Sequence, residues 1–414
     1  MRVRKWQDIT LGQLVSLQRG HDLPSDRREA GCVPVMGSFG VTGHHSVARA
    51  KGPGVIVGRS GASAGVVSFT EADYWPLNTC LFSTNFHGNN PKFVFYLLST
   101  LNLGSYNSGS AQPSLNRNYI APIPISVPLR AEQDEIANLL SALDDKIVLN
   151  GQISETLAAM AQAIFRDWFI DFGPVRRKLA GETDPVAIMG GLTPDLARAT
   201  ELAALFPRTL TDDGLPEGWF DLALSAHLDI IGGGTPKTSV ETYWGGTIPW
   251  FSVVDTPIGS NTFVFATEKT VTEAGLAGSS ARMVPAGTTI ISARGTVGNL
   301  AVAAQDMTFN QSCYALRSAR GDYPYFVYLT AAHAVERLRA MAHGSVFSTI
   351  TRQTFDSLTF PQAPLPLMGA FEATVEPLFS RLRASVAESR TLAETRDYLL
   401  PRLMSGAVRV EVSR

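Results

Sequence analysis

Two glycine-rich stretches of this chain each set an arginine directly after an apolar run. Residues 58–65 read Gly-Arg-Ser-Gly-Ala-Ser-Ala-Gly, and residues 293–298 read Ala-Arg-Gly-Thr-Val-Gly. Glycine lets backbone amides approach a phosphate closely, and arginine adds a fork of N–H donors. A tight turn that needs positive φ, with its arginine in water, explains the same pattern equally well. The candidate phosphate-binding residues are Arg59, Ser60, Arg294 and Thr296.

A second pair of stretches combines hydroxyl, amide and arginine side chains. Residues 112–118 read Gln-Pro-Ser-Leu-Asn-Arg-Asn, and residues 347–353 read Phe-Ser-Thr-Ile-Thr-Arg-Gln. These groups suit phosphate oxygens and base edges. Each stretch also suits a helix start with Ser114 or Thr349 as N-cap, and the two interpretations are compatible because a helix N-terminus binds phosphate. The candidates are Gln112, Asn116, Arg117, Thr351 and Arg352.

A third pair of stretches carries isolated basic residues. Residues 232–237 read Gly-Gly-Gly-Thr-Pro-Lys, which predicts a flexible loop, and residues 18–24 read Gln-Arg-Gly-His-Asp-Leu-Pro. The candidates for contact with DNA are Arg19, Thr235 and Lys237.

The sequence offers no set of catalytic residues. Glu-x-Lys, which nuclease chemistry would favour, does not occur in the chain. Residues 61–65 match the Gly-x-Ser-x-Gly nucleophile elbow by letter, but the residues that follow predict a strand where the elbow needs a helix. His44 and His45 have no ligand cluster at metal spacing and are interpreted as a surface loop. We therefore predict no enzyme activity, no metal site and no cofactor in this chain.

The paired stretches belong to a long internal repeat. Residues 109–170 return as residues 344–405 with a constant offset of 235 residues (344 − 109), so that Gly109-Ser110 reappears as Gly344-Ser345. A repeat of this length indicates two copies of one domain plan. Earlier in the copies the offset is 212 (Pro24 to Pro236), so the second copy carries a net insertion of about 23 residues (235 − 212), mostly between 249 and 287. The copies should therefore contact a ligand differently.

Each copy ends in a helical heptad pattern. Apolar residues recur every seven positions from residue 131 to 171, with a second column four residues later, and the pattern returns in the second copy. A helix of about forty residues is about 60 Å long and needs a partner along its length. Pro377 predicts a kink or a late helix start. The predicted coiled-coil seam residues are Ile136, Leu143, Asn150, Leu157, Ile164, Phe371, Leu378, Ser385, Leu392 and Leu399.

Asn150 and Ser385 are the polar members of this seam. A polar residue at a seam position can fix helix register. Gly151 offers a second explanation, a local helix irregularity at the same step.

The pattern predicts an α+β protein with a pseudo-two-fold internal repeat, in which two globular mixed β/α domains are joined by two long helices that pack against each other. The predicted ranges are 1–128 for the first domain, 129–173 for the first helix, 174–216 for a linker, 217–365 for the second domain and 366–406 for the second helix. Cys80 and Cys313 occupy similar contexts in the two copies and are interpreted as buried strand residues.

Composition limits the possible settings. No apolar run approaches the roughly 18 residues of a membrane span, and three cysteines in 414 residues do not form a disulfide framework, so we predict a cytoplasmic protein. The formal charge of −2 is not that of a typical nucleic-acid binder. A protein of this size can still gather its basic groups on one face.

Taken in order, these motifs resemble specificity subunits of type I restriction–modification systems over nearly the whole length. The resemblance rests on the duplicated plan, the two arginine–glycine loops, the two segments that end in Leu-Asn-Arg and Ile-Thr-Arg, Pro-Glu-Gly-Trp at 216–219, and the helix end at 164–175. It implies that each globular domain is a target recognition domain that reads one half of a split site in double-stranded DNA. It makes the candidates named above DNA-binding residues.

The same resemblance implies that the long helices pack antiparallel, set the gap between the half-sites and dock two methyltransferase subunits, which a restriction and translocase subunit then joins. S-adenosylmethionine, ATP and magnesium would belong to those partners. The alternative is a structural or interaction protein with two β-rich modules on a coiled-coil stalk. Basic residues in both glycine loops favour the DNA interpretation.

Overall fold

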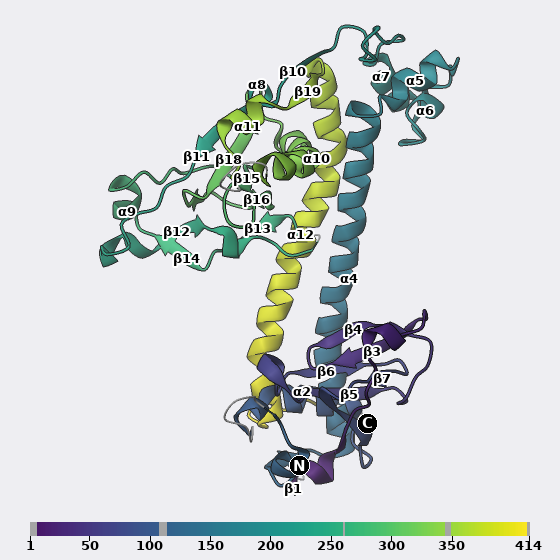
Figure 1. The fold of residues 1–414 in the computed structure, drawn as a ribbon, viewed down its shortest axis with the longest axis vertical. Helices are drawn as coiled ribbons and strands as arrows, with labels where there is room; N and C mark the ends of the chain where they lie inside the picture. The colour runs from purple at the N-terminus through teal and green to yellow at the C-terminus, as the bar shows by residue number, and fades with distance from the viewer. Residues whose placement is uncertain (1–5, 107–113, 260, 344–348, 412–414) are drawn as a thin grey trace. The chain divides into compact units, whose positions relative to one another are not determined.

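The computed structural model describes residues 6–106, 114–259, 261–343 and 349–411, which form two compact units. Unit 1 takes the described parts of 1–147 and 390–414, and unit 2 takes those of 148–389. Each unit holds one module together with one part of helix α4 (Arg130–Phe169) and one part of helix α12 (Leu365–Met404) (Figure 1). The predicted α+β class, with two modules and two long helices, is confirmed.

Unit 1 contains the first module. Its elements are β1 Gln7–Thr10, α1 Leu11–Leu14, β2 Ser16–Arg19, η1 Ser25–Arg27, β3 Val33–Gly37, β4 Gly40–His45, β5 Gly54–Gly58, η2 Gly61–Ser63, β6 Val67–Thr70, β7 Trp75–Pro76, β8 Cys80–Asn85, α2 Pro91–Thr100, η3 Leu103–Tyr106, α3 Arg117–Ile120 and β9 Pro124–Val127. The strands form a β2-β8-β5-β6 sheet, a β4-β3-β7 sheet and a β1-β9 ladder. Helix α2 covers the larger sheet, because its buried Phe93 and Leu97 share a hydrophobic cluster with Val55 and Leu81.

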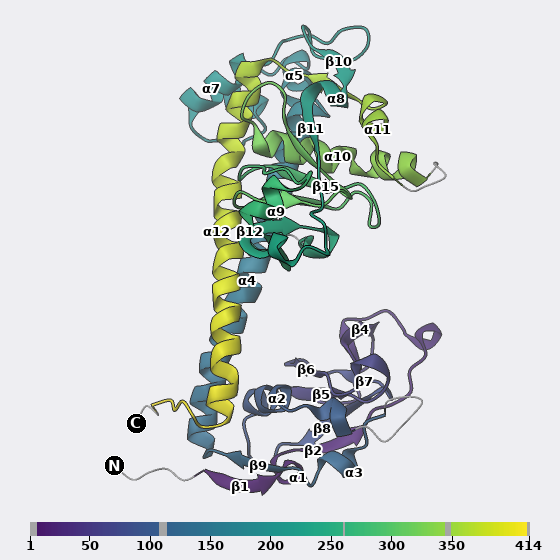
Figure 2. The same cartoon turned by 90° about the vertical axis from the view of Figure 1, so that its left-hand side faces the viewer.

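Unit 2 contains the second module. Its elements are α5 Gly173–Leu179, α6 Pro185–Ile188, α7 Leu196–Ala204, β10 Phe220–Ala223, α8 Leu224–His227, β11 Leu228–Gly232, η4 Glu241–Tyr243, β12 Trp244–Phe251, η5 Val253–Asp255, β13 Phe263–Val264, β14 Lys269–Val271, α9 Glu273–Ala277, β15 Thr289–Ser292, β16 Leu300–Ala303, β17 Thr308–Phe309, β18 Cys313–Ser318, α10 Pro324–His343, α11 Arg352–Asp356 and β19 Thr359–Gln362. Helix α10 covers the sheet as α2 does in unit 1 (Figure 2).

The two modules repeat the same topology. The sheet β11-β18-β15-β16 repeats β2-β8-β5-β6, the β12-β17 pair repeats β3-β7, and β10-β19 repeats β1-β9. The residues between 249 and 287 form η5, β13, β14 and α9, and β13 adds a fifth strand to the main sheet of unit 2. Cys80 begins β8 and Cys313 begins β18, and both are buried, as predicted.

The long helices run antiparallel within each unit. In unit 1, Leu140 of α4 shares a hydrophobic cluster with Leu403 of α12. In unit 2, Trp168 near the end of α4 packs against Phe371 near the start of α12, with ring centroids 5.7 Å apart. Helix α12 begins at Leu365 and continues through Pro377, so the predicted late start is wrong. Pro377 is exposed, which puts the carbonyl that lacks its helical partner within reach of water.

The predicted seam residues differ in burial. The buried ones are Ile136, Asn150, Phe371 and Ser385. The half-buried ones are Leu143, Leu157, Ile164, Leu378, Leu392 and Leu399. In the column of α4 that lies four residues later, Leu140, Ser154, Ala161 and Trp168 are buried and Ile147 is half-buried. An α-helix has 3.6 residues per turn, so residues spaced exactly seven apart shift gradually around the helix and away from the face that contacts the partner helix.

The polar step of the seam is fully inside unit 2. The Asn150 Nδ2 donates to Glu388 Oε2 at 2.9 Å. The Asn150 Oδ1 and the Ser385 hydroxyl are buried without a hydrogen-bond partner. Helix α4 continues through Gly151, so the structure gives this step no break in the helix. The predicted role of these residues in fixing register stays a prediction.

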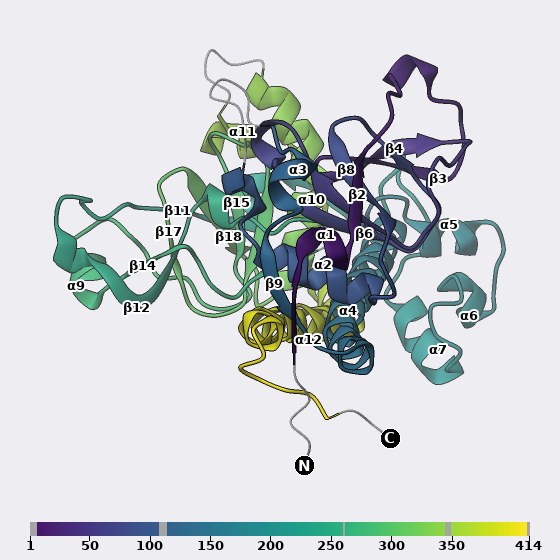
Figure 3. The same cartoon turned by 90° about the horizontal axis from the view of Figure 1, so that it is seen from below.

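The segment between the copies is folded. Phe172 has φ 52° and separates α4 from α5, and the short helices α5, α6 and α7 lie together (Figure 3). Val175 and Phe206 join the main hydrophobic cluster of unit 2. The Arg177 guanidinium donates to both carboxylate oxygens of Asp167 at 3.0 and 2.7 Å. Residues that the sequence predicts as a linker therefore help to form the core of unit 2.

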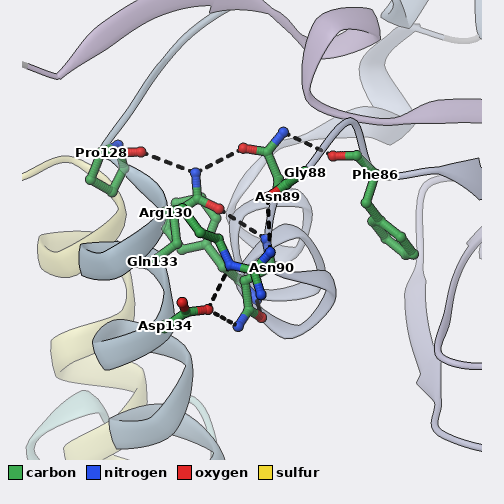
Figure 4. A network of polar contacts seen from close by, with 9 residues as sticks. Phe86, Gly88, Asn89, Asn90, Pro128, Arg130, Gln133 and Asp134 are labelled. Atoms are coloured by element: carbon green, nitrogen blue, oxygen red, sulfur yellow. Dashed lines mark hydrogen bonds and ion pairs between the residues drawn. The ribbon is translucent and has the colours of Figure 1, made fainter.

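Module 1 is attached to the helices by a polar network (Figure 4). The Gln133 Oε1 accepts from the Asn90 N–H at 3.0 Å, and the Gln133 Nε2 donates to Asn89 Oδ1 at 2.8 Å. The Asp134 carboxylate accepts from Asn90 Nδ2 and from Arg130 Nε at 2.6 and 2.7 Å. Asn90 also caps α2, because its side chain accepts from the Phe93 N–H, and Pro91 starts the helix.

Asp144 makes a second polar attachment. Its carboxylate accepts the Tyr96 hydroxyl at 2.5 Å and pairs with Arg396 at 2.7 Å, which ties α2 to both long helices within unit 1.

Module 2 is attached mainly by aromatic rings. Phe165 of α4 lies 5.9 Å, between ring centroids, from each of Phe326, Phe360 and Phe371. Glu372 of α12 accepts the N–H groups of Tyr325 and Phe326, at 2.9 and 3.0 Å, at the start of α10. Burial raises the pKa of Glu372 to about 7.

Candidate nucleic-acid interface

In both units the structure joins two of the predicted stretches. The Arg59 carbonyl accepts from the Leu115 N–H at 2.7 Å, and Ser60 bridges to Ser114. In unit 2 the Ala293 carbonyl accepts from the Ile350 N–H at 3.0 Å. Leu115 and Ile350 are fully buried and act as anchors for the segments that follow them. The arginine–glycine loops thus lie beside the segments that carry Arg117 and Arg352.

The two loop arginines do not occupy equivalent positions. Gly58 pairs with Cys80 and Ser292 pairs with Cys313, so the residue equivalent to Arg59 is Ala293. Arg294 comes one residue later. The offset between the copies is 235 residues from Gly109 onward, but it is 234 between Arg59 and Ala293 and 233 between Cys80 and Cys313. Arg59 is half-buried and Arg294 is exposed.

Both loops make turns that need glycine. Gly61 and Gly65 have φ of 76° and 90°, and Gly295 and Gly298 have φ of 78° and 82°. A side chain on Gly65 would also collide with the backbone of Gly104. The turn requirement is therefore real in both units. Phosphate binding by Arg59, Ser60, Arg294 and Thr296 stays a prediction.

Arg117 and Arg352 make the same internal contact. The Arg117 Nη1 donates to the Leu17 carbonyl at 3.5 Å, and the Arg352 Nη2 donates to the Ile230 carbonyl at 2.6 Å. Leu17 pairs with Ser83 of β8, and Ile230 pairs with the matching residue of β18. Both arginines remain exposed side chains, and a guanidinium has five N–H donors, so this contact leaves others for a ligand.

The helices after these segments begin two residues later than predicted. Asn116 caps α3 and accepts from the Asn118 N–H at 3.0 Å, and Thr351 caps α11. The prediction of Ser114 and Thr349 as caps is wrong. Ser114 instead pairs with Ser60 in extended conformation, and helix can begin only after the buried anchor residue. With four and five residues, α3 and α11 are single turns.

Gly232 ends strand β11, and Gly233 and Gly234 are tightly packed, so the prediction of a flexible loop is wrong. The Gly234 N–H donates to the Phe309 carbonyl at 3.0 Å. A Cβ on Gly233 would collide with the Asn310 carbonyl, and one on Gly20 would collide with the Leu77 carbonyl. These glycines allow close approach of two backbones. Beyond them Arg19 and Lys237 are exposed and Thr235 is half-buried.

Other predicted features have mixed outcomes. Gln112 lies outside the described residues. His44 and His45 belong to strand β4 rather than to a loop, and His45 is buried with its ring edge on Trp75. Within the described ranges no group of three or more metal-ligating side chains occurs, and no helix has the length and apolarity that crossing a bilayer requires.

The loop after β3 is not among the predicted stretches but lies beside one of them. The Ser38 hydroxyl donates to the Thr79 carbonyl at 2.5 Å, and the Arg59 N–H donates to the same oxygen at 2.9 Å. The turn after β3 therefore lies beside the arginine–glycine loop of the same module. A two-residue hairpin turn that ends in Gly40 is the signal that could have found it.

Comparison with known proteins gives a consistent result. The family model described as the type I restriction modification DNA specificity domain matches residues 3–159 and 216–367. The type I restriction enzyme HindI specificity subunit of Haemophilus influenzae is 26% identical over 357 residues, which cover 77% of each chain. The MjaIX specificity subunit of Methanocaldococcus jannaschii is 29% identical over 176 residues, 42% of this chain and 40% of the relative.

One solved structure supports the fold. The crystal structure of the type I restriction-modification system S subunit from M. genitalium superposes with a TM-score of 0.63 at 15% identity, and covers 100% of this chain and 98% of that one. The two family matches coincide with the two copies of the repeat, each with its module and joined loops. This chain belongs to the DNA specificity family of type I restriction–modification systems.

Proposed function

We propose that this chain is the DNA-recognition subunit of a type I restriction–modification complex, with each module reading one half of a split site. One observation carries this proposal. In both units an arginine–glycine turn is hydrogen-bonded to the segment that bears Arg117 or Arg352. Two related readers in one chain suit a DNA site made of two unlike halves.

The loop edges offer two kinds of contact. Arginine and hydroxyl groups on glycine turns suit phosphates, and mixed amide and arginine groups suit base edges. In unit 1, Gln18, Arg117 and Asn118 line a surface hollow of about 410 Å³. We assign phosphate contact to Arg19, Arg59, Ser60, Lys237, Arg294 and Thr296. We assign base contact to Gln112, Asn116, Arg117, Thr235, Thr351 and Arg352.

The long helices set the gap between the half-sites and dock the partners. Each has 40 residues, about 60 Å at 1.5 Å per residue, which exceeds the 34–36 Å or so between sites one DNA turn apart. Two methyltransferase subunits bind the helices, and a restriction and translocase subunit joins them. The chain itself is not an enzyme, since its family consists of specificity subunits. It acts where cellular DNA lies, in the cytoplasm.

Sequencing that detects methylated adenines tests the proposal. The chain, expressed with its methyltransferase partners, should mark a split motif with a fixed gap. Inserting one helical turn into α4 and a matching turn into α12 should lengthen the gap and leave both half-sites unchanged. The same insertion between Gly190 and Gly191, outside the long helices, is the control and should change nothing. A motif without a gap, or no marked motif, would contradict the proposal.

A further inference from the structure

The most exposed large apolar side chains lie in one pair of loops. Among the described residues, Ile258, Phe39 and Val254 are exposed by 88%, 79% and 73%, and the next large apolar side chain is exposed by 60%. Phe39 follows β3 and the other two follow β12. Such side chains gain free energy when a partner removes them from water.

Phe39 and Val254 are equivalent residues of the two modules. The Met36 carbonyl accepts from the Leu77 N–H at 2.8 Å, and the Phe251 carbonyl accepts from the Asn310 N–H at 2.9 Å. Leu77 and Asn310 lie three residues before Cys80 and Cys313, the equivalent cysteines at the starts of β8 and β18. Phe39 and Val254 each come three residues after the matched carbonyl. Exposure at this position is thus a shared feature of the plan.

The loop of unit 1 presents Phe39 from a fixed turn. Gly37 pairs with Gly40 across the hairpin, and Gly40 has φ of 100°, so the turn has only two residues between its strands. The Ser38 hydroxyl and the Arg59 N–H share the Thr79 carbonyl, which sets Phe39 beside the arginine–glycine loop. The loop that carries Arg59 therefore lies next to the apolar tip.

The loop of unit 2 is also fixed beside its basic loop. Val253 packs against a hydrophobic cluster that contains Cys313, and the preceding Ser312 carbonyl accepts from the Arg294 N–H at 3.2 Å. The Asp255 carboxylate accepts from the Ser252 N–H at 2.8 Å and from the Glu268 N–H at 2.7 Å. These two backbone N–H groups fix the Asp255 carboxylate inside the loop.

We propose that Phe39 in unit 1, and Val254 with Ile258 in unit 2, are apolar wedges that press against a base step of the half-site read by their own module. This inference rests on the proposed function. Apolar side chains partly unstack a base step when neighbouring cations hold the backbone, and the loops supply both parts. The aromatic wedge of unit 1 unstacks its step more than the aliphatic pair of unit 2.

The experiment uses the full chain with its methyltransferase subunits on a duplex that contains the mapped site. 2-Aminopurine, whose fluorescence rises on unstacking, replaces one adenine at a time, except for the adenines that are methylated, because a methyltransferase flips its target base out of the stack by itself. Wild type should give a maximum at one step of each half-site. Phe39→Ala should abolish the maximum in one half-site only and lower DNA affinity about tenfold, the effect of losing one base–aromatic contact. Val254→Ala with Ile258→Ala should abolish the other maximum.

Matched variants make the result specific. Val47→Ala and Phe220→Ala remove side chains that are exposed by 51% each but lie outside these loops, and they should match wild type. Phe39→Trp should keep the maximum. If Phe39→Ala and the double variant keep both maxima and full affinity on a site that is still methylated, the wedges are refuted and the proposed function stands. If wild type marks no split site, both fail.

Discussion

The two modules follow one topology but are held to the long helices by different chemistry. Module 1 is attached by amide hydrogen bonds and ion pairs. Gln133 of α4 is hydrogen-bonded to Asn90 at the start of α2, and Asp144 of α4 contacts both Tyr96 and Arg396. Module 2 is attached by a cluster of rings around Phe165 and by the carboxylate of the half-buried Glu372. Hydrogen-bonded attachments depend on direction, whereas ring packing depends on area and shape.

The difference shows what duplication preserves. Strand pairing, the glycine contacts and the buried anchors Leu115 and Ile350 recur because they define the module. The surface that meets the helices needs only to be complementary within its own unit, so its chemistry has diverged. The two attachments should therefore respond differently to substitution and to pH.

The largest effect is expected at the aromatic attachment. Phe165→Ala should lower the free energy of unfolding of unit 2 by about 3–5 kcal/mol, because a fully buried ring leaves a cavity among other rings. Urea unfolding gives the magnitude, and hydrogen exchange should locate the loss in residues of unit 2. Leu196→Ala, exposed by 59% on α7 of unit 2, is the control and should change stability by less than about 0.5 kcal/mol. A loss below about 1 kcal/mol for Phe165→Ala would contradict the importance of this cluster.

The next effect is a pH dependence confined to unit 2. The pKa of Glu372 is raised from 4.5 to about 7 by burial, to which Asp322 and Glu376 add. The folded state keeps the proton longer than the unfolded state, so stability should fall as pH rises from about 4.5 to about 7, by up to about 3 kcal/mol.

Glu372→Gln should flatten this slope and make the attachment resemble that of Gln133 in unit 1. Glu376→Gln, at an exposed neighbouring position, should keep it. Denaturation at a series of pH values measures both variants. A slope that persists in Glu372→Gln would assign the titration to another group.

A smaller effect is expected at the polar attachment of module 1. Asp144→Ala removes the partner of the Tyr96 hydroxyl and one of the two carboxylates that pair with Arg396, which keeps Asp397, and should cost about 1–2 kcal/mol in unit 1. The estimate is discounted because the Asp144 and Arg396 side chains are 30% and 29% exposed. Glu394→Ala removes the partner of Arg390, a pair 3.7 Å apart on the same helix, and should cost less than about 0.5 kcal/mol. Equal losses in thermal melts of the two variants would count against the Asp144 bridge.

The smallest effect is expected at the polar step of unit 2. The Ser385 hydroxyl is buried without a partner, so Ser385→Ala should raise stability by about 1 kcal/mol. Ser380→Ala, at an exposed position of α12, should leave it unchanged. Calorimetry measures the change in stability of each variant relative to wild type. Destabilisation by Ser385→Ala would mean that the hydroxyl is needed where it lies.

Much of the fold could be predicted because it depends on local pattern. The heptad columns predict both long helices, short apolar runs between glycines predict the strands, and the repeated letters predict the two modules. Pro91 at a helix start and Cys80 inside a buried strand follow from the same local rules.

The predictions that are wrong concern features that depend on contacts between residues far apart in the sequence. The caps at Asn116 and Thr351 lie beyond Ser114 and Thr349 because each preceding segment is first held by a strand end elsewhere. Gly233 is rigid only because Asn310 lies against it. The ring cluster and the Gln133 network could not be predicted either, because each joins elements that are far apart in sequence.

The division of the chain fixes the order in which it can fold during synthesis. Unit 2 is one continuous stretch, whereas unit 1 needs the residues from 390 onward. Leu403 and Met404 complete the cluster that contains Ile136 and Leu140. At about 5–20 residues per second, the ribosome needs roughly 10–50 seconds to travel from residue 147 to residue 390. The first segment of unit 1 therefore leaves the ribosome before unit 2, but its apolar cluster stays incomplete and exposed until Leu403 and Met404 have been synthesised.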